Sequence, residues 1–427
     1  MHPNALLEAT TDLLRLVLRF EHPADAVVDR FFRDQRKSQA FGPRERSTLT
    51  ETVFNVLRQR LLFEHFAPSG TGAKERRLAL LGFAAPRDFL KTGLSEVEKR
   101  WLDQCDAIDP NGLLDRHRHN LPDWLAERLK AQLGTEDFWQ LVEALHQPAP
   151  LDLRVNTLVA KRADVRKDMN AAAIRSEPTP FSPWGLRVEG KPSLAKLEAF
   201  QRGAIEVQDE GSQLLALLLD AKRGEMVVDF CAGAGGKTLA IGATMRNTGR
   251  LYAFDTSAHR LAALKPRLAR SGLSNVHPVA IAHERDDRIK RLAGKIDRVL
   301  VDAPCSGLGT LRRNPDLKWR LKTARIDELA AMQTAILQSA ARLVKPGGRL
   351  VYATCSLLVE ENEAIAAQFS EAHAQDFALL PAAPLLDALG VEAGAALCAG
   401  PAGNDFLRLW PHRHRTDGFF AAVWQRT

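Results

Sequence analysis

The sequence lacks several features that would assign it to a class at once. No apolar run approaches the roughly 18 residues of a membrane span, so we expect no membrane segment. The five cysteines form no Cys-x-x-Cys pair, which argues against a structural zinc site, and we expect no metal. The amino terminus lacks the basic-then-apolar pattern of a signal peptide. Together with the odd cysteine count, this favours reduced thiols and a cytoplasmic protein.

Charge and length give broader limits. Lysine and arginine number 59 against 52 aspartates and glutamates, a net charge of +7. This excess is a weak indicator of a polyanionic partner such as RNA or DNA. A chain of 427 residues is long enough for two or three domains. Nothing in the sequence indicates more than a monomer.

The first part of the chain, residues 1–145, has a helical pattern. Apolar residues recur at helical spacing over Thr48–Phe66, after a Gly42-Pro43 break, and again over Leu121–Leu145. Gln147–Pro150 reads as a linker. We interpret residues 146–205 as a small α/β connecting segment, with short strands at Leu151–Val155 and Gly185–Val188 on either side of a proline-rich stretch.

Residues 206–427 alternate between short apolar strands and helices, which predicts a doubly wound, mainly parallel α/β sheet. Such sheets bind ligands at the carboxyl ends of their strands. A helix over Ile326–Val344 precedes one strand, and Lys345–Gly348 is expected to turn the chain between them. The predicted strands are Met226–Phe230, Arg250–Asp255, Val276–Ala282, Asp297–Asp302, Arg349–Thr354, Phe406–Trp410 and Phe419–Trp424.

A glycine-rich loop follows the first of these strands and opens a helix. It reads Cys231-Ala232-Gly233-Ala234-Gly235-Gly236-Lys237. Its glycines permit a tight turn and close approach of a ligand to the backbone. Asp255, which ends the next strand, suits the two hydroxyls of a ribose. The dinucleotide spacing Gly-x-Gly-x-x-Gly is absent, and a phosphate-binding Walker loop would need glycine at Ala232, so we favour an adenosyl cofactor over a triphosphate.

Two cysteines follow two other strand ends. One strand ends in Asp302-Ala303-Pro304-Cys305, and another in Thr354-Cys355. A single cysteine is more often a buried apolar residue. If the two strands are neighbours, however, both thiols and Asp302 converge beside the cofactor loop.

These residue types suit the methylation of cytosine at carbon 5, which is a poor nucleophile. A thiolate that adds to carbon 6 makes carbon 5 reactive, and Asp302 could hold or supply a proton near N3. After methyl transfer the proton on carbon 5 must leave, and Cys305 could assist this step directly or through water.

Several motifs together resemble the RsmB/Sun family of RNA cytosine-5 methyltransferases. They span about residues 205–425, with Leu153–Asn156 as an upstream extension. The helical amino-terminal region, including Gly42–Arg46, more loosely resembles the NusB-like RNA-binding domain of the RsmB branch. The motifs are Val207–Gln213, Ile296–Gly307, Asn314–Trp319, Tyr352–Ser356 and Thr416–Phe420.

This resemblance implies a Rossmann-like class I methyltransferase domain over residues 206–427, with S-adenosylmethionine as cofactor. It also implies a NusB-like RNA-binding domain over residues 1–145. It assigns Cys355 as the nucleophile and Cys305 as the group that promotes product release. Asp302 contacts the base and, with residues 231–237 and Asp255, helps hold the cofactor. The RsmB branch acts on 16S ribosomal RNA, which makes RNA the expected partner.

Two departures from the family pattern affect the cofactor site. The family's loop usually has Ala-Pro where this chain has Gly233-Ala234, although Gly235-Gly236-Lys237 is kept. The third strand usually carries an aspartate near the adenine. Here Ile281–Glu284 occupies that region, and Asp286 and Asp287 come slightly later, so the adenine contact is unassigned.

A basic cluster follows the Asp302 loop, and its position favours contacts with RNA phosphates. Trp319 within it could stack on a base or fill the core. Two alternatives stay open: a DNA cytosine-5 methyltransferase, in which the two cysteine roles would be exchanged, and a non-catalytic RNA-binding assembly factor. The cluster consists of Arg312, Arg313, Lys318, Arg320 and Lys322.

Overall fold

The structure, a computed structural model, describes residues 1–35, 41–401 and 403–427. The chain forms two compact units. The first comprises Met1–Pro148 and Thr310–Lys322, and the second comprises Ala149–Gly309 and Thr323–Thr427. Within these described ranges no helix is long and apolar enough to cross a membrane, and no group of histidine, cysteine, aspartate and glutamate could hold a metal ion.

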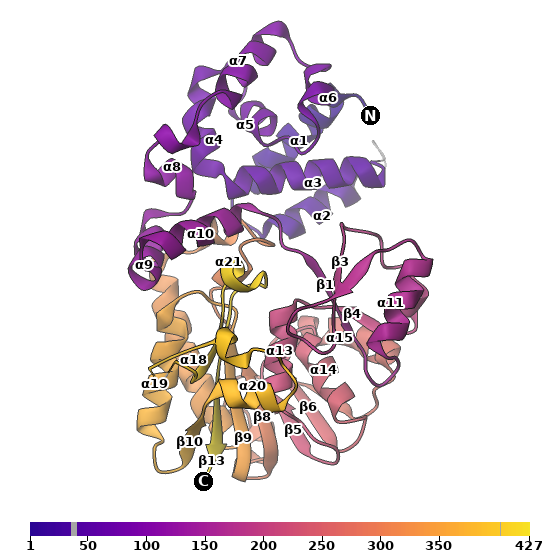
Figure 1. The fold of residues 1–427 in the computed structure, drawn as a ribbon, viewed down its shortest axis with the longest axis vertical. Helices are drawn as coiled ribbons and strands as arrows, with labels where there is room; N and C mark the ends of the chain where they lie inside the picture. Colours follow the sequence, from indigo (N-terminus) through magenta and orange to yellow (C-terminus); the bar gives the residue numbers. More distant parts are fainter. Residues whose placement is uncertain (36–40, 402) are drawn as a thin grey trace. The chain divides into compact units, whose positions relative to one another are not determined.

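The first unit is built from helices around a core of leucine and phenylalanine side chains. The predicted helix over Thr48–Phe66 is in fact two helices, because Gln59 leaves helical geometry (φ −113°). The second predicted stretch is also divided, at Gly134 (φ +77°). The helices (indigo to purple in Figure 1) are α1 Pro3–Val17, α2 Ala24–Asp34, α3 Pro43–Arg58, α4 Arg60–Phe66, α5 Lys74–Gly82, α6 Arg87–Lys91, α7 Glu96–Asp106, α8 Asp115–His119, α9 Asp123–Leu133 and α10 Thr135–His146.

The segment Thr310–Lys322, with the short helix α17 (Leu317–Arg320), completes this helical unit. The Lys318 ammonium, 3% exposed, donates to the Arg58 carbonyl at 2.9 Å. The Trp319 indole N–H donates to the Leu57 carbonyl at 2.7 Å, and its ring packs against the helical core. Arg312 is also buried. The prediction of phosphate contacts is therefore wrong for Arg312 and Lys318, because their side chains pack inside the protein.

The second unit begins with a small antiparallel sheet of order β2-β3-β1-β4. Strands β1 (Leu151–Val155) and β3 (Gly185–Val188) lie where the sequence predicted them. Strands β2 (Ser176–Pro178) and β4 (Ile205–Val207) were not predicted. Both are three residues long, and Pro178 is tolerated because β2 lies at the edge of the sheet. Helices α11 (Arg162–Ala171) and α12 (Glu198–Gln201) accompany this sheet.

The large sheet has the order β11-β12-β13-β9-β8-β5-β6-β7, with β10 beside β13. Its central strands are parallel, whereas β10 to β13 add antiparallel pairs, so the sheet is more mixed than predicted. The strands are β5 Met226–Asp229, β6 Arg250–Asp255, β7 Val276–Ala280, β8 Ile296–Asp302, β9 Val344–Thr354, β10 Phe377–Leu380, β11 Cys398–Ala399, β12 Phe406–Leu409 and β13 Phe419–Arg426.

The predicted turn at Lys345–Gly348 is wrong. These residues belong to strand β9 rather than to a separate turn, as an irregularity where the pairing register with β8 shifts. Gly347 supplies the positive φ of +74° that this distortion uses.

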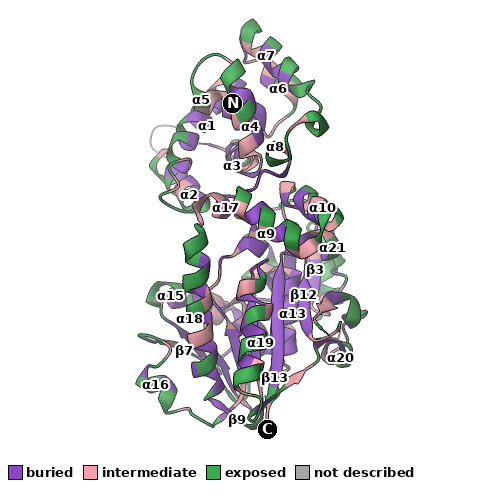
Figure 2. Ribbon diagram, turned by 90° about the vertical axis from the view of Figure 1, so that its left-hand side faces the viewer, coloured by how far each residue is buried: buried purple, intermediate pink, exposed green. Residues whose placement is uncertain are grey.

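Alternate residues of the strands face two different cores. Helices α13 (Glu210–Leu218), α14 (Gly236–Thr244) and α20 (Ala382–Ala388) pack with Leu300 and Val351 on one face. Helices α18 (Thr323–Ala341) and α19 (Glu363–Ala372) pack on the other, and Figure 2 shows exposed residues on the outer sides of both. This layering brings the carboxyl ends of β5, β6, β8 and β9 to one edge of the sheet.

We predict that acid destabilises the helical unit through two histidines. Burial lowers the pKa of His119 and of His146 from 6.5 to about 4. The unfolded chain therefore binds these protons at a higher pH than the folded chain, and stability is lost as the pH falls from 6.5 through 4. The full loss would be roughly 3 kcal/mol per histidine.

Urea unfolding followed by tryptophan fluorescence at neutral and at mildly acidic pH tests this prediction. The double substitution His119→Asn and His146→Gln should flatten the pH dependence, whereas His22→Gln, at an exposed histidine of the same unit, should not. An unchanged pH dependence in the double variant would contradict it.

Candidate active site

The glycine-rich loop joins β5 to α14 at the carboxyl edge of the large sheet. Gly235 has a φ of +83°, and a Cβ there would lie 2.1 Å from a methyl carbon of Leu264. Only glycine fits this position without strain. Gly233 also has a positive φ, +55°, and its backbone N–H donates to Asp255 Oδ2 at 2.8 Å. The loop is thus bound to the end of β6.

Asp255 lies where the sequence placed it, at the end of β6. Its second oxygen accepts the Ser257 backbone N–H at 2.7 Å, and the residue is 6% exposed. Each carboxylate oxygen has two lone pairs, so both retain capacity for one more donor. A buried carboxylate with this spare capacity can accept hydroxyl groups of a ligand.

Asp229, at the end of β5, is a candidate that the sequence analysis missed. Its Oδ2 accepts the Thr238 hydroxyl at 2.6 Å, whereas its Oδ1 is buried without a hydrogen-bond partner. Burial, together with the charges of Asp302 and Asp255, raises its pKa to about 7. The signal was present in the sequence, because an aspartate that ends a strand directly before a glycine-rich loop lies beside any ligand of that loop.

Lys237 connects the loop to the next strand of the sheet. Its Nζ donates to Asp302 Oδ2 at 2.7 Å, and the lysine side chain is 11% exposed. Burial alone would lower the pKa of Lys237, but the Asp302 carboxylate outweighs this and raises it. The Lys237 ammonium therefore lies beside the Asp302 side chain at the ends of β5 and β8.

The two predicted cysteines lie in contact. Strands β8 and β9 are parallel neighbours, with Asp302 opposite Ala353. The sequence analysis made the convergence of the two thiols depend on this pairing. Cys305 Sγ and Cys355 Sγ are 3.3 Å apart, and both residues are partly buried. The hydrogen bond to Cys355, together with burial, raises the pKa of the Cys305 thiol.

A buried carboxylate, Glu361, fixes the two cysteine loops to each other. Its Oε1 accepts the Ser306 backbone N–H at 2.8 Å, and its Oε2 accepts the Ser306 hydroxyl at 2.5 Å. The hydroxyl of Ser356 donates to the same Oε2. Gln333 bridges Glu361 Oε1 and the Pro304 carbonyl, at 3.0 Å from each. Ser306 and Ser356, which follow the two cysteines, thus share one hydrogen-bond acceptor, Glu361. This shared acceptor keeps the two thiols together.

The loop that precedes β13 also contacts the cysteine loops. The Gly309 N–H donates to the Cys355 carbonyl at 2.8 Å, and the Gly418 N–H donates to the Gly309 carbonyl at 2.9 Å. A Cβ on Gly309 would lie 2.1 Å from the Gly418 carbonyl oxygen. The backbone of the Thr416–Gly418 loop is therefore linked through Gly309 to the backbone of Cys355.

The structure does not bring every candidate residue to the site. Asp286 is committed to the turn before α16 (Asp287–Lys290), where its carboxylate accepts the N–H groups of Ala282 and Arg288. His283 is exposed.

Cys231 and Ala232 begin the glycine-rich loop, and burial raises the pKa of the Cys231 thiol well above its ordinary value.

Comparison with known proteins identifies relatives along most of the chain. Residues 216–425 match the family described as 16S rRNA methyltransferase RsmB/F, and residues 121–195 match its ferredoxin-like domain. A protein of Synechocystis named probable ribosomal RNA small subunit methyltransferase B is 32% identical, over 96% of this chain and 97% of its own length.

Solved structures agree with this relationship. The crystal structure of the protein PH0851 superposes with a TM-score of 0.78 at 28% identity and covers 99% of both chains. A methyltransferase homologue from Pyrococcus horikoshii is 31% identical, with a TM-score of 0.61, over 75% of this chain and all of its own. The first of these likenesses extends over the helical unit as well as the sheet.

We predict that Glu361→Ala destabilises the second unit and loosens the cysteine pair. Removal of the carboxylate leaves the Ser306 N–H as a buried donor without an acceptor and takes one of the two acceptors from the Gln333 amide, which costs about 2–4 kcal/mol. Glu361→Gln should cost less, because its amide oxygen can still accept both. Thermal unfolding measures the loss, with exposed Glu371→Ala as the matched control. Equal stability of Glu361→Ala and Glu371→Ala would contradict the role of this carboxylate.

Proposed function

Because the chain belongs to the RsmB/F family of 16S rRNA methyltransferases, we propose that it methylates carbon 5 of a cytosine in small-subunit ribosomal RNA. S-adenosylmethionine is the methyl donor. The observation that carries the proposal is the contact between Cys305 and Cys355, 3.3 Å apart at the strand edge that also holds the glycine-rich loop. A covalent route through one thiol, with release through the other, uses both cysteines of this contact.

The residues at this edge fit an adenosyl cofactor. A Cβ built on Gly233 would meet no other described atom within 4 Å, so there is space for a ligand above the loop backbone. The buried Asp255 carboxylate can accept ribose hydroxyls, and Asp302 with residues 231–237 completes the proposed binding site. When bound, S-adenosylmethionine supplies an electrophilic methyl group for carbon 5 of the cytosine.

Cys355 is the proposed nucleophile. Its thiolate adds to carbon 6 of the cytosine, which forms the S–C6 bond and makes carbon 5 electron-rich. The target base must leave its stack to reach this thiolate. The addition builds negative charge on the ring at N3, and Asp302, which lies beside Lys237, is placed to hold or supply the proton that neutralises this charge.

Cys305 is the proposed release group. Its pKa is raised first of all by the hydrogen bond to Cys355. Once Cys355 is bonded to carbon 6, its thiol no longer makes this hydrogen bond, and burial remains as a cause of the raised pKa. In the proposed release step, the Cys305 thiolate accepts the carbon 5 proton, directly or through water. Loss of this proton breaks the S–C6 bond and restores the Cys355 thiolate.

We further propose that the protein acts as a monomer in the cytoplasm. Every group used in this scheme comes from a single chain. The scheme also needs both thiols reduced, which a cytoplasmic environment provides. The ribosomal RNA substrate is present in the same compartment.

We predict that Cys355→Ala abolishes methyl transfer. Without the nucleophile, carbon 5 is not activated, and the rate should fall by at least roughly 10³-fold. Tritium transfer from labelled S-adenosylmethionine to unmodified 16S rRNA measures this, with Cys398→Ala as a control outside the site. Turnover within tenfold of the wild type would rule out Cys355 as the nucleophile.

We predict that Cys305→Ala still methylates but remains attached to the RNA. The carbon 5 proton leaves slowly without Cys305, so the S–C6 bond persists. A labelled protein–RNA band that survives denaturing electrophoresis is the expected result. If this band appears with Cys355→Ala instead, the roles of the two cysteines are exchanged, as in the DNA-type arrangement.

A further inference from the structure

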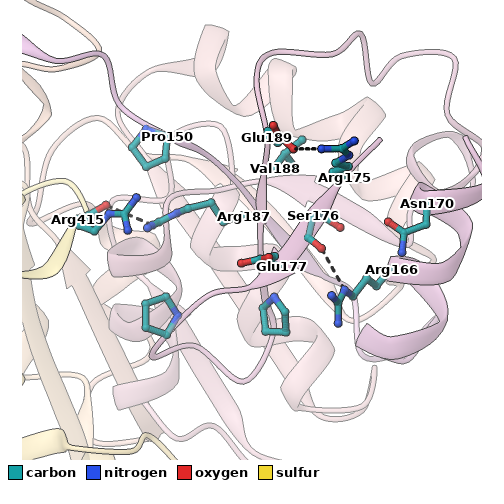
Figure 3. Close-up of a pocket in the computed structure, with 12 residues that line it drawn as sticks. Pro150, Arg166, Asn170, Arg175, Ser176, Glu177, Arg187, Val188, Glu189 and Arg415 are labelled. Carbon is teal, nitrogen blue, oxygen red and sulfur yellow. Dashed lines mark hydrogen bonds and ion pairs between the residues drawn. The ribbon is translucent and has the colours of Figure 1, made fainter. Parts of the chain in front are cut away.

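An arginine-lined pocket of about 810 Å³ lies on the small sheet of the second unit, away from the two cysteines. Arg166 comes from α11, Arg175 precedes β2, Arg187 lies on β3, and Arg415 follows α21 (Pro411–His414). Figure 3 shows Arg415 at one end of the pocket and Arg166 and Arg175 at the other, with Glu177 between them. Four arginines against two glutamates, Glu177 and Glu189, make the lining positive.

Three of these arginines have cationic groups that a ligand can reach. Arg166, Arg175 and Arg415 are exposed. Arg166 uses only its Nε internally, to donate to the Ser176 carbonyl at 3.0 Å. Arg175 faces Glu189 at 3.6 Å, but the side chains are 85% and 70% exposed, so water screens this pair and a ligand can displace it. No carboxylate of the described chain forms an ion pair with the Arg415 guanidinium.

Arg187 has a structural role, because the Asp152 carboxylate already compensates its charge. It binds both oxygens of Asp152, at 2.7 and 2.8 Å. Its Nη2 also donates to the backbone carbonyl of Arg415 at 3.2 Å. Arg187 therefore positions the Arg415 loop and leaves ligand contacts to the other three arginines.

Arg415 occupies a backbone conformation that arginine rarely adopts. Its φ is +59° and its ψ is +17°, the left-handed region in which a non-glycine residue is strained by about 1 kcal/mol or more. Glycine or asparagine would end α21 with less strain.

The same loop connects the pocket to the active site. Asp417, two residues after Arg415, donates its N–H to Asp209 Oδ2 at 3.1 Å. Gly418 follows and is hydrogen-bonded to Gly309, which is bonded in turn to the Cys355 carbonyl. A ligand held by Arg415 is thus coupled through a short backbone path to the loop that carries the proposed nucleophile.

We propose that this pocket binds the backbone phosphates of the single-stranded RNA segment that flanks the target cytosine, with Arg166, Arg175 and Arg415 as the phosphate ligands. The proposal rests on the proposed function, since an RNA substrate supplies the polyanion. An open, wide pocket with separated guanidinium groups suits successive phosphates of a strand better than one enclosed anion. A base removed from its stack leaves its neighbours in such an extended strand.

The test compares two arginines of the same exposure and backbone conformation. Arg415→Gly removes the pocket side chain and tolerates the positive φ. Arg246→Gly does the same at an exposed arginine (φ +54°) that does not line the pocket. Binding of a fluorescent single-stranded RNA oligonucleotide is measured by anisotropy at several salt concentrations, and KM and kcat are measured on 16S rRNA. Thermal unfolding checks that both variants remain folded.

We expect Arg415→Gly, and separately Arg175→Gln, to weaken RNA binding and to raise KM several-fold. The slope of log affinity against log salt should become shallower by about 0.7 for each phosphate that the variant no longer neutralises. Arg246→Gly should match the wild type, and Arg415→Lys should recover part of the affinity.

Affinity and salt slope that stay at wild-type values in both pocket variants would overturn the proposal, while methylation by those variants would leave the proposed function intact. Failure of the wild type to methylate would instead count against the proposed function, and RNA binding would still test the pocket. If inorganic phosphate or cytidine monophosphate binds in an Arg415-dependent way while the RNA affinity does not depend on Arg415, the ligand is a small anion and the RNA proposal is wrong.

Discussion

The proposed active site depends on one buried carboxylate, Glu361. Two loops leave adjacent parallel strands, β8 and β9, and the residues after their cysteines both bind this side chain. Parallel neighbours bring strand ends to the same edge of a sheet, but they do not fix the loops beyond those ends. A shared acceptor does so, because displacement of either loop would leave a buried donor without a partner. The 3.3 Å contact between the thiols follows from this constraint.

The ion pair of Lys237 and Asp302 acts in the same way between β5 and β8. Lys237 was expected to serve the cofactor as part of the glycine-rich loop. Its ammonium lies 2.7 Å from the carboxylate of Asp302, which the sequence analysis assigned to both the base and the cofactor. The ion pair therefore opposes independent movement of the glycine-rich loop and of the Asp302 turn, the proposed sites for the cofactor and the base. This coupling suits a reaction in which the methyl donor and carbon 5 must meet at a fixed distance.

The strands of the large sheet were predictable because local sequence determines them. Apolar residues bounded by glycine or charge marked β6 and β8, and β6 was predicted with its observed bounds. Strand β10 was missed because it is short and pairs with β13, which is distant in sequence. Strand β11 was missed because it is only two residues long. The convergence of Cys305 and Cys355 was expected on the condition that their two strands are neighbours, and the parallel pairing of β8 with β9 meets this condition. The role of Glu361 was not predicted, because it arises only when the chain after β9 folds back under both cysteine loops. The prediction that Lys318 contacts RNA phosphates failed for a related reason, because the charge of a residue in the sequence does not show whether its side chain is buried.

The course of the segment Thr310–Lys322 limits how this protein can be rearranged. The chain leaves the catalytic unit after Gly309, contributes a helix to the helical unit, and returns at Thr323. The two units are therefore joined by three covalent crossings instead of one. Removal of residues 1–148 would take away the hydrogen-bond partners of Trp319 and Lys318. The segment Thr310–Lys322 would then expose to water side chains that are buried in the whole chain. The helical unit therefore cannot be exchanged as one continuous segment. A gene fusion or domain exchange would have to include both Met1–Pro148 and Thr310–Lys322.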